Sequence, residues 1–278
     1  MPGTLVHSLV LAIALAAATG DADPHVAALR ERLGPGAWTI VVEPPFVVAG
    51  DEDAATVKRR AEKSIRWAAE KLKQEFFAKD PDGYLDVYLF KDEKSYESNA
   101  IRLFGEKPTT PYGYYSSRHR ALVMNIATGG GTLVHEIVHP YVEANFPGCP
   151  AWFNEGLGSL YERCTERDGR IVGLTNWRLE KLKEAIEKKE TVPFEKLLGT
   201  SAAEFYGGDE RGVHYAQARY LCYYLQEKGL LARYYREFHA ARESDPGGVA
   251  TLKRILGAPD LEEFRKEWER FVRALTYP

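Results

Sequence analysis

The five residues His135-Glu136-Ile137-Val138-His139 constrain this chain more than any other feature of it. Residues four apart on an α-helix lie one above the other on the same face, so the two imidazoles can hold one metal ion together. A glutamate beside the first histidine can reach a water molecule bound to that ion. The pattern therefore predicts a helix that carries His135 and His139 as metal ligands and Glu136 as a general base.

A second segment offers a third ligand. A catalytic zinc site needs three protein ligands and one open position for water. Glu155 lies 16 positions after His139, within the run Trp-Phe-Asn-Glu-Gly-Leu-Gly-Ser that covers residues 152–159. The Pro- and Gly-rich residues 146–150 suit a loop between two helices, and Pro150 suits the start of the second helix. This spacing makes Glu155 the candidate for the third ligand.

Together the two segments resemble the gluzincins, which are zinc metallopeptidases of the peptidase MA-like superfamily that includes aminopeptidase-N-like and thermolysin-like enzymes. The matching residues, 135–159, span about 25 positions. The resemblance implies one Zn²⁺ per chain, held by His135, His139 and Glu155, with Glu136 as the catalytic base. It also implies a thermolysin-like fold with a cleft between two lobes, and a peptide or protein as the substrate.

Nearby residues bear on this assignment. Glu143 lies four positions beyond His139 and is an alternative third ligand, although that choice would leave Glu155 unexplained. Pro140 removes a helical hydrogen bond, so a kink is expected there and the helix need not run straight to Asn145. Metzincins fit less well, because they place a glycine three positions after the second histidine, where this chain has Val142.

Residues 121–126 are predicted to form a strand just before the metal-binding helix. In gluzincins this strand is a sheet edge that lines the cleft and pairs with the substrate backbone. Met124 and Asn125 are accordingly candidates for lining the substrate. Aminopeptidase-N-like families carry a G-x-M-E-N segment here whose glutamate holds the free amine, whereas this chain reads Leu-Val-Met-Asn-Ile over residues 122–126. The missing glutamate favours an endopeptidase over an aminopeptidase.

The developing oxyanion needs a donor besides the metal, and a later helix of the resembling enzymes supplies a tyrosine or histidine. Tyr215 is the first candidate here, His214 is the alternative, and Tyr206 comes third. Asn154 and Ser159 are candidates for orienting the metal ligands. Two other functions remain open from the residues alone: a non-catalytic metal-binding module on a peptidase-like scaffold, and a zinc hydrolase of non-peptide bonds.

Strand patterns precede the metal-binding motif and helical patterns follow it, which predicts the α+β class. Residues 21–278 are expected to form one metallopeptidase domain, with a mixed α/β lobe over 21–127 and a helical lobe over 128–278. The periodicity of apolar residues predicts each element. The expected strands are 38–43, 85–90, 112–115 and 120–126, and the expected helices are 54–78, 92–104, 177–189, 213–227, 232–241, 249–256 and 261–275.

The first 20 residues contain an apolar run, residues 9–18, of the length of a signal-peptide core. Residues 1–20 are therefore expected to be a signal peptide and the protein to be secreted or periplasmic, although no Lys or Arg precedes the run. An uncleaved anchor is the alternative. The net charge of −3 gives no indication of nucleic acid as a partner. The three cysteines allow one disulfide or none, and the oligomeric state stays open.

Overall fold

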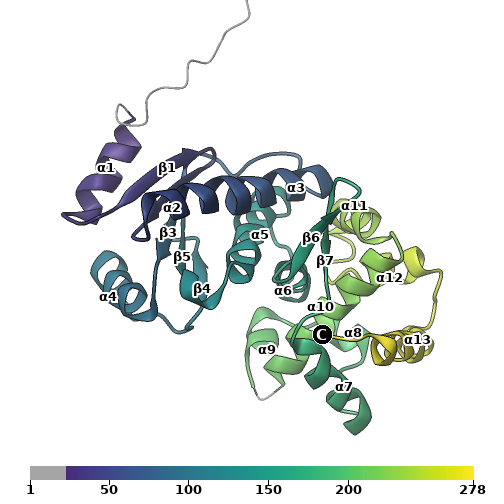
Figure 1. Ribbon diagram of the computed structural model, residues 1–278. Helices are drawn as coiled ribbons and strands as arrows, with labels where there is room; N and C mark the ends of the chain where they lie inside the picture. Colours follow the sequence, from purple (N-terminus) through teal and green to yellow (C-terminus); the bar gives the residue numbers. More distant parts are fainter. Residues whose placement is uncertain (1–22, 209) are drawn as a thin grey trace, which may run out of the picture.

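The computed structural model describes residues 23–208 and 210–278, and the predicted signal segment 1–20 lies outside these ranges. The described chain combines one five-stranded mixed sheet with many helices, which agrees with the α+β expectation. Figure 1 shows the sheet among the purple to teal elements, and the green to yellow helices gathered on the other side of the molecule. Across the described ranges, no helix is long and apolar enough to cross a membrane.

The main sheet has the strand order β1-β2-β3-β5-β4. Its strands are β1 Thr39–Glu43, β2 Phe46–Gly50, β3 Leu85–Phe90, β4 Gly113–Ser116 and β5 Ala121–Asn125. Strands β2, β3 and β5 are parallel, while β1 and β4 run antiparallel to their neighbours. The edge beside the helix that carries His135 and His139 is therefore β4. The prediction that residues 121–126 form the edge strand is wrong, because β5 pairs with β3 on one side and β4 on the other.

Both faces of the sheet are covered by helices, which explains why its central strands β2, β3 and β5 are buried at every position and apolar at most of them. One set of alternating side chains, including Val48, Val87 and Leu122, packs under α2 Ala54–Arg60, the π-helix η1 Ala61–Arg66 and α3 Trp67–Glu75. The opposite set, including Val47 and Val123, packs under α1 Pro24–Leu33 and α4 Glu93–Phe104. The predicted helix 54–78 thus forms as three consecutive segments, and Asp92 caps α4 as its position suggests.

Helices dominate after residue 130, as predicted. They follow a short 3₁₀ turn, η2 Ile126–Thr128, and include every helix that the apolar periodicity predicts beyond that point. The helices are α5 Gly131–Asn145, α6 Ala151–Leu160, α7 Arg178–Lys188, α8 Phe194–Leu198, α9 Ala202–Tyr206, α10 Arg211–Glu227, α11 Leu231–Ala241, α12 Val249–Leu256 and α13 Leu261–Ala274. Cys149, Cys164 and Cys222 are all free thiols, so none of the possible disulfides is formed.

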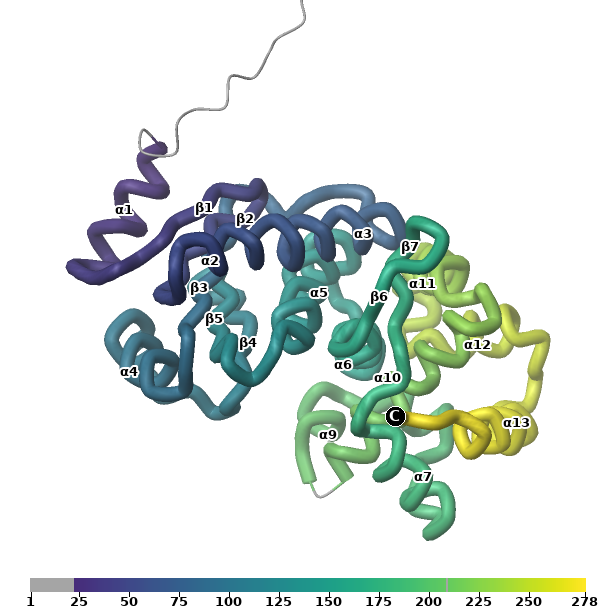
Figure 2. Tube along the Cα trace, viewed as in Figure 1, coloured from purple at the N-terminus to yellow at the C-terminus, as the bar shows by residue number. Residues whose placement is uncertain are grey.

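A small hairpin ties the helical part of the chain to the sheet part. Its strands are β6 Cys164–Arg167 and β7 Arg170–Gly173, and both views place the hairpin beside α3 (Figures 1 and 2). The Lys71 ammonium donates to the Gly169 carbonyl at 2.6 Å and pairs with Glu166 at 3.0 Å. The indole N–H of Trp67 donates to the same Glu166 carboxylate at 3.0 Å. These contacts fasten the segment that follows α6 onto α3.

Candidate metal centre

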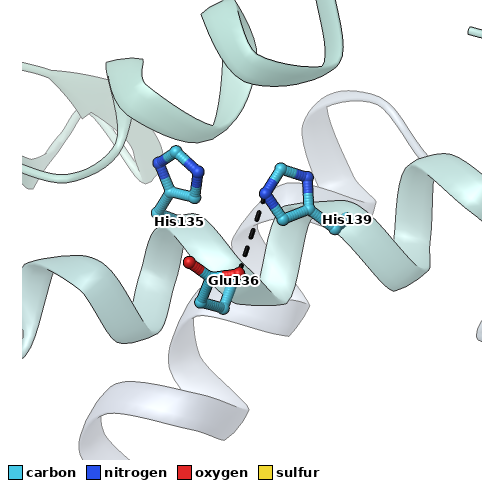
Figure 3. A group of neighbouring side chains, drawn as sticks. All are labelled: His135, Glu136 and His139. Atoms are coloured by element: carbon cyan, nitrogen blue, oxygen red, sulfur yellow. Dashed lines mark ion pairs between the residues drawn. The ribbon is translucent and has the colours of Figure 1, made fainter. Parts of the chain in front are cut away.

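The candidate metal-binding motif lies on α5, in the middle of the molecule. Leu133, Ile137 and Val138 place the helix in the hydrophobic core, and His135 and Glu136 are themselves buried. His135, Glu136 and His139 each offer one ligand atom within 4.8 Å of the other two. Figure 3 shows the three side chains on this one helix, with the Glu136–His139 pair dashed. The helical spacing in the sequence therefore does bring the three groups together.

Pro140 does not end the helix, because α5 continues to Asn145. The Asn145 side chain explains this continuation. Its amide N–H₂ donates to the Tyr141 carbonyl at 2.9 Å, and its oxygen accepts the backbone N–H groups of Ala78 and Lys79 at 3.0 and 3.1 Å. Tertiary contacts thus hold the last turn of α5 against α3 and its following loop, despite the hydrogen bond that proline removes.

His139 is oriented by a residue of the second helix. The Nδ1 atom of His139 lies 3.0 Å from the side-chain oxygen of Asn154 on α6. Because that oxygen can only accept, this contact favours the neutral tautomer with the proton on Nδ1, in which Nε2 carries the lone pair that a metal would use. The predicted orienting role of Asn154 therefore has the geometry it requires.

Glu155 faces His135 across the two helices. Its Oε2 atom is 3.2 Å from Nε2 of His135, is buried, and has no hydrogen bond of good geometry. Two ligand atoms about 2.0–2.2 Å from a tetrahedral zinc ion are about 3.3–3.6 Å apart. The observed separation is close to this spacing, so the free carboxylate oxygen and the imidazole nitrogen fit a shared metal ion. Gly158, one turn further on α6, allows this approach, since a Cβ there would lie 3.2 Å from the His135 ring.

The Glu155 carboxylate has a second contact, from a tyrosine that ranked last among the sequence candidates. The hydroxyl of Tyr206 on α9 donates to Oε1 of Glu155 at 2.8 Å, which leaves Oε2 directed at His135. Burial by itself raises the pKa of Glu155, but His135 and His139 outweigh burial and lower that pKa to about 2. In the metal-free site Glu155 is therefore held as a carboxylate by positive charge on the imidazoles, in the place where a metal ion would supply that charge.

Glu136 is oriented by the edge strand. Its Oε2 atom accepts the backbone N–H of Tyr115 on β4 at 2.9 Å and lies 3.8 Å from Nε2 of His139. Burial raises the pKa of the Glu136 carboxyl above its usual value, which brings it closer to the range of an efficient general base at neutral pH. Strand β4 therefore orients the Glu136 carboxylate, and α5 carries His135 and His139 beside it.

A further carboxylate, Glu162, supports the site and was not identified from the sequence. Its Oε1 atom lies 3.3 Å from Nδ1 of His135, the ring nitrogen on the side opposite Glu155. Glu162 follows Glu155 by seven positions, and residues seven apart fall on the same side of a helix. That spacing was the available signal, although α6 itself ends at Leu160. His135 is thus flanked by a carboxylate at each nitrogen.

The site opens into a cleft of about 1340 Å³ between the sheet part and the helical part of the chain. Tyr114 and Tyr115 of β4 line one wall, and Tyr206, Arg211 and Tyr215 line the other. Tyr215, the first candidate for the oxyanion donor, thus faces the cleft, and burial followed by the charge of Glu155 raises its pKa. The alternative donor His214 is buried with Nδ1 3.3 Å from the Phe205 carbonyl, and it does not line this cleft.

Three other candidates lie away from the cleft. Met124 is fully buried on β5, and its side chain occupies the space beside Gly113 of β4. The Asn125 amide donates to the Pro111 carbonyl at 3.0 Å. The Ser159 hydroxyl donates to the backbone carbonyl of Glu155 at 2.5 Å, so it contacts the helix backbone and not the carboxylate. These contacts assign structural roles to all three residues.

Gly131 permits the start of α5 to approach the end of α6. A Cβ at Gly131 would lie 2.0 Å from the Glu162 carbonyl oxygen, so Gly131→Ala is expected to destabilise the fold by about 1–3 kcal/mol through overpacking. The matched control is Gly130→Ala, where φ is −78° and nothing lies within 4 Å of the added carbon. Urea unfolding of both variants checks this, and equal stabilities would contradict the close approach.

Comparison with known proteins finds no family model and no curated protein that matches this chain.

Proposed function

We propose that this protein is a zinc metallopeptidase of the gluzincin type with a thermolysin-like arrangement of its two parts. The observation that supports it most strongly is the position of Glu155, whose free Oε2 lies 3.2 Å from Nε2 of His135 although the two residues come from different helices. The ligand set would be His135, His139 and Glu155, with one ion per chain. Two imidazoles and one carboxylate are the ligand types found in catalytic zinc sites.

The residues around this ligand set would serve different steps of peptide hydrolysis. Zinc bound there would lower the pKa of a water molecule toward about 7 and polarise the scissile carbonyl. The Glu136 carboxylate would accept a proton from the attacking water and later donate it to the leaving amine. Tyr215 and Tyr206 both line the cleft and are the candidate donors to the oxyanion, although the Tyr206 hydroxyl would first have to leave Oε1 of Glu155.

The edge strand β4 would bind the substrate backbone. Gly113, Tyr114 and Tyr115 of this strand line the cleft, and β4 is the last strand of the described sheet, with β5 as its neighbour on one side. The Tyr115 N–H is already donated to Glu136, so the substrate would pair with other backbone groups of the edge. An extended peptide could therefore add to this edge as a further strand. The cleft holds about 1340 Å³ and is open at the surface, which favours an endopeptidase. Secretion, directed by the segment 1–20, is part of the same proposal.

The purified protein is expected to contain about one zinc ion per chain. His135→Ala or His139→Ala should lose the metal, because each removes one of three ligands. His119→Ala and His239→Ala are the controls, since these imidazoles pack against Phe104 and against Phe146 and Tyr235, respectively. Atomic absorption after dialysis measures the metal content. Equal zinc content in His139→Ala and the unaltered protein would refute the assignment.

A further inference from the structure

The carboxylate of Glu162 connects the metal site to α7. Its Oε1 atom, 3.3 Å from Nδ1 of His135, also accepts a hydrogen bond from Nη2 of Arg178 at 2.7 Å. Its Oε2 atom accepts from Nε of Arg178 at 3.2 Å and from the side-chain amide of Asn176 at 3.0 Å. Arg178 therefore grips both carboxylate oxygens with two parallel donors, the geometry in which arginine binds a carboxylate most specifically.

We propose that Arg178 is a positioning residue of the metal site, which acts on His135 through Glu162. This inference rests on the zinc site of the proposed function. In zinc proteins a ligating imidazole is usually oriented by a partner at its other nitrogen, and loss of that partner weakens metal binding. Here that partner is a carboxylate that is itself fixed by the guanidinium fork of Arg178.

Burial makes this support necessary. Glu136, Glu155 and Glu162 are three carboxylates in one buried region, with Glu162 only 7% exposed at its side chain. A buried carboxylate is costly unless it is paired and hydrogen-bonded. Nδ1 of His135 is also buried and makes no hydrogen bond of standard geometry, so Glu162 at 3.3 Å is the acceptor closest to satisfying it. Without Arg178, the carboxylate would lose two donors and could turn away from His135 toward the open cleft.

The position of Arg178 is itself well determined. Its backbone N–H donates to the side-chain oxygen of Asn176 at 3.1 Å, and the backbone N–H of Asn176 donates to the Tyr220 hydroxyl at 3.1 Å. The guanidinium carbon lies 5.4 Å from the ring centroids of both Trp177 and Tyr215. These contacts anchor the start of α7 to α10, so the guanidinium presents a fixed fork to Glu162 and is not a mobile surface charge.

Arg178 also lines the cleft, so a direct contact with substrate is the competing explanation. The two roles differ in one measurable respect. A positioning residue alters the affinity for zinc in the absence of any substrate, whereas a substrate-binding residue alters KM and leaves the zinc affinity unchanged. Zinc affinity of the substrate-free protein is therefore the measurement that separates them.

The experiment compares zinc dissociation constants, obtained by competition with a chromogenic chelator, for the full chain and for Glu162→Gln, Arg178→Gln and the double variant. Each single substitution is expected to weaken zinc binding about 10–100-fold. The double variant should bind zinc at most about threefold more weakly than the single variant with the lower affinity. The reason is that both substitutions disrupt the same support of His135. Arg254→Gln is the matched control, because Nε and Nη2 of Arg254 donate to Glu237 at 3.1 and 2.8 Å in an exposed ion pair.

Two readouts exclude a general loss of structure. The circular dichroism spectrum of each metal-free variant at the assay temperature should match that of the unaltered protein, although the melting temperature of Arg178→Gln is expected to fall because Glu162 stays buried with fewer donors. Arg178→Lys should recover part of the zinc affinity because it keeps the charge but loses the fork. The visible spectrum of the cobalt-substituted protein should change in the same direction for Glu162→Gln and Arg178→Gln, since both act on the same imidazole.

The outcomes separate this inference from the proposed function. Absence of zinc binding by the unaltered protein would refute the proposed function and this inference with it. Normal zinc binding by the unaltered protein together with an unchanged constant for Arg178→Gln would overturn the inference alone, and so would multiplication of the two effects in the double variant. If Arg178→Gln does not fold, Arg178→Lys is decisive, and a constant equal to that of the unaltered protein would overturn the inference.

Discussion

Replacing Glu136 by glutamine is expected to lower peptide hydrolysis by about a hundredfold or more while zinc stays bound. In the unaltered protein the Tyr115 backbone nitrogen lies 2.9 Å from Oε2 of Glu136. Glutamine keeps the shape of this side chain, and its carbonyl oxygen can still accept the same N–H. It cannot accept a proton from the attacking water. Steady-state rates on a mixed peptide library, with zinc content measured on the same samples, check this result.

A chelator-treated sample and a Glu143→Gln sample are the controls for that measurement. Glu143 also lies in the cleft wall, and its carboxylate accepts the Tyr115 hydroxyl at 2.8 Å. Among the described residues, no hydrogen bond or ion pair joins Glu143 to His135 or His139, so Glu143 is not expected to act as the base. An unaltered hydrolysis rate in Glu136→Gln would mean that the water is activated by another group, or that the activity belongs to a contaminant.

The second large effect distinguishes Glu155 from Glu143 as the third ligand. Glu155→Gln is expected to weaken zinc binding severely and to abolish hydrolysis, because it leaves a site of two histidines. Glu143→Gln should change zinc binding by no more than about tenfold, since Glu143 is exposed and its carboxylate is bonded to the Tyr115 hydroxyl. Both substitutions remove one negative charge from the same cleft, so a general electrostatic effect would weaken the two alike.

Zinc dissociation constants for this pair of variants decide the question. The structure already separates the two side chains, because Oε2 of Glu155 lies 3.2 Å from Nε2 of His135 whereas Glu143 contacts the edge strand. If Glu143→Gln proves the weaker binder, the gluzincin ligand set is refuted, and the site must be rebuilt around the single helix α5.

The helices and most strands of this protein could be predicted from local periodicity. The helix over residues 261–275 is an example, because Leu261, Phe264, Trp268 and Val272 repeat at helical spacing and all are buried in α13. The strand Leu85–Phe90 was predicted from its β-branched and aromatic residues, and it forms β3. In such segments, the interactions that select the structure lie within one or two turns or along one strand.

One strand and one hairpin show what was overlooked. Strand β2, with the buried run Phe46–Gly50 bounded by Pro45 and Asp51, carried the apolar signal of a central strand. The hairpin β6–β7 carried an Asp168-Gly169 turn, and both residues have the positive φ of such a turn, 52° and 76°. Both signals were local and available. The role of the hairpin in joining α6 to α3 had no local signal, because it depends on contacts with Lys71, about a hundred positions away in the chain.

The edge strand and the support of the metal site belong to a different category. Neither the identity of β4 as the edge nor the contact of Arg178 with Glu162 has a local signal, since strand order and side-chain pairing between distant helices are set when the elements pack. The same holds for Tyr206, whose hydroxyl reaches Glu155 from a helix 51 positions later in the chain.

The sequence by itself determined that His135, Glu136 and His139 lie together, because a helix places residues four apart on one face whatever surrounds it. Only the tertiary structure decided which group faces each imidazole nitrogen, with Asn154 at Nδ1 of His139 and with Glu155 and Glu162 at the two nitrogens of His135. The physical reason is that helical geometry acts over four residues through the backbone, whereas ligand orientation requires side chains from separate elements to meet.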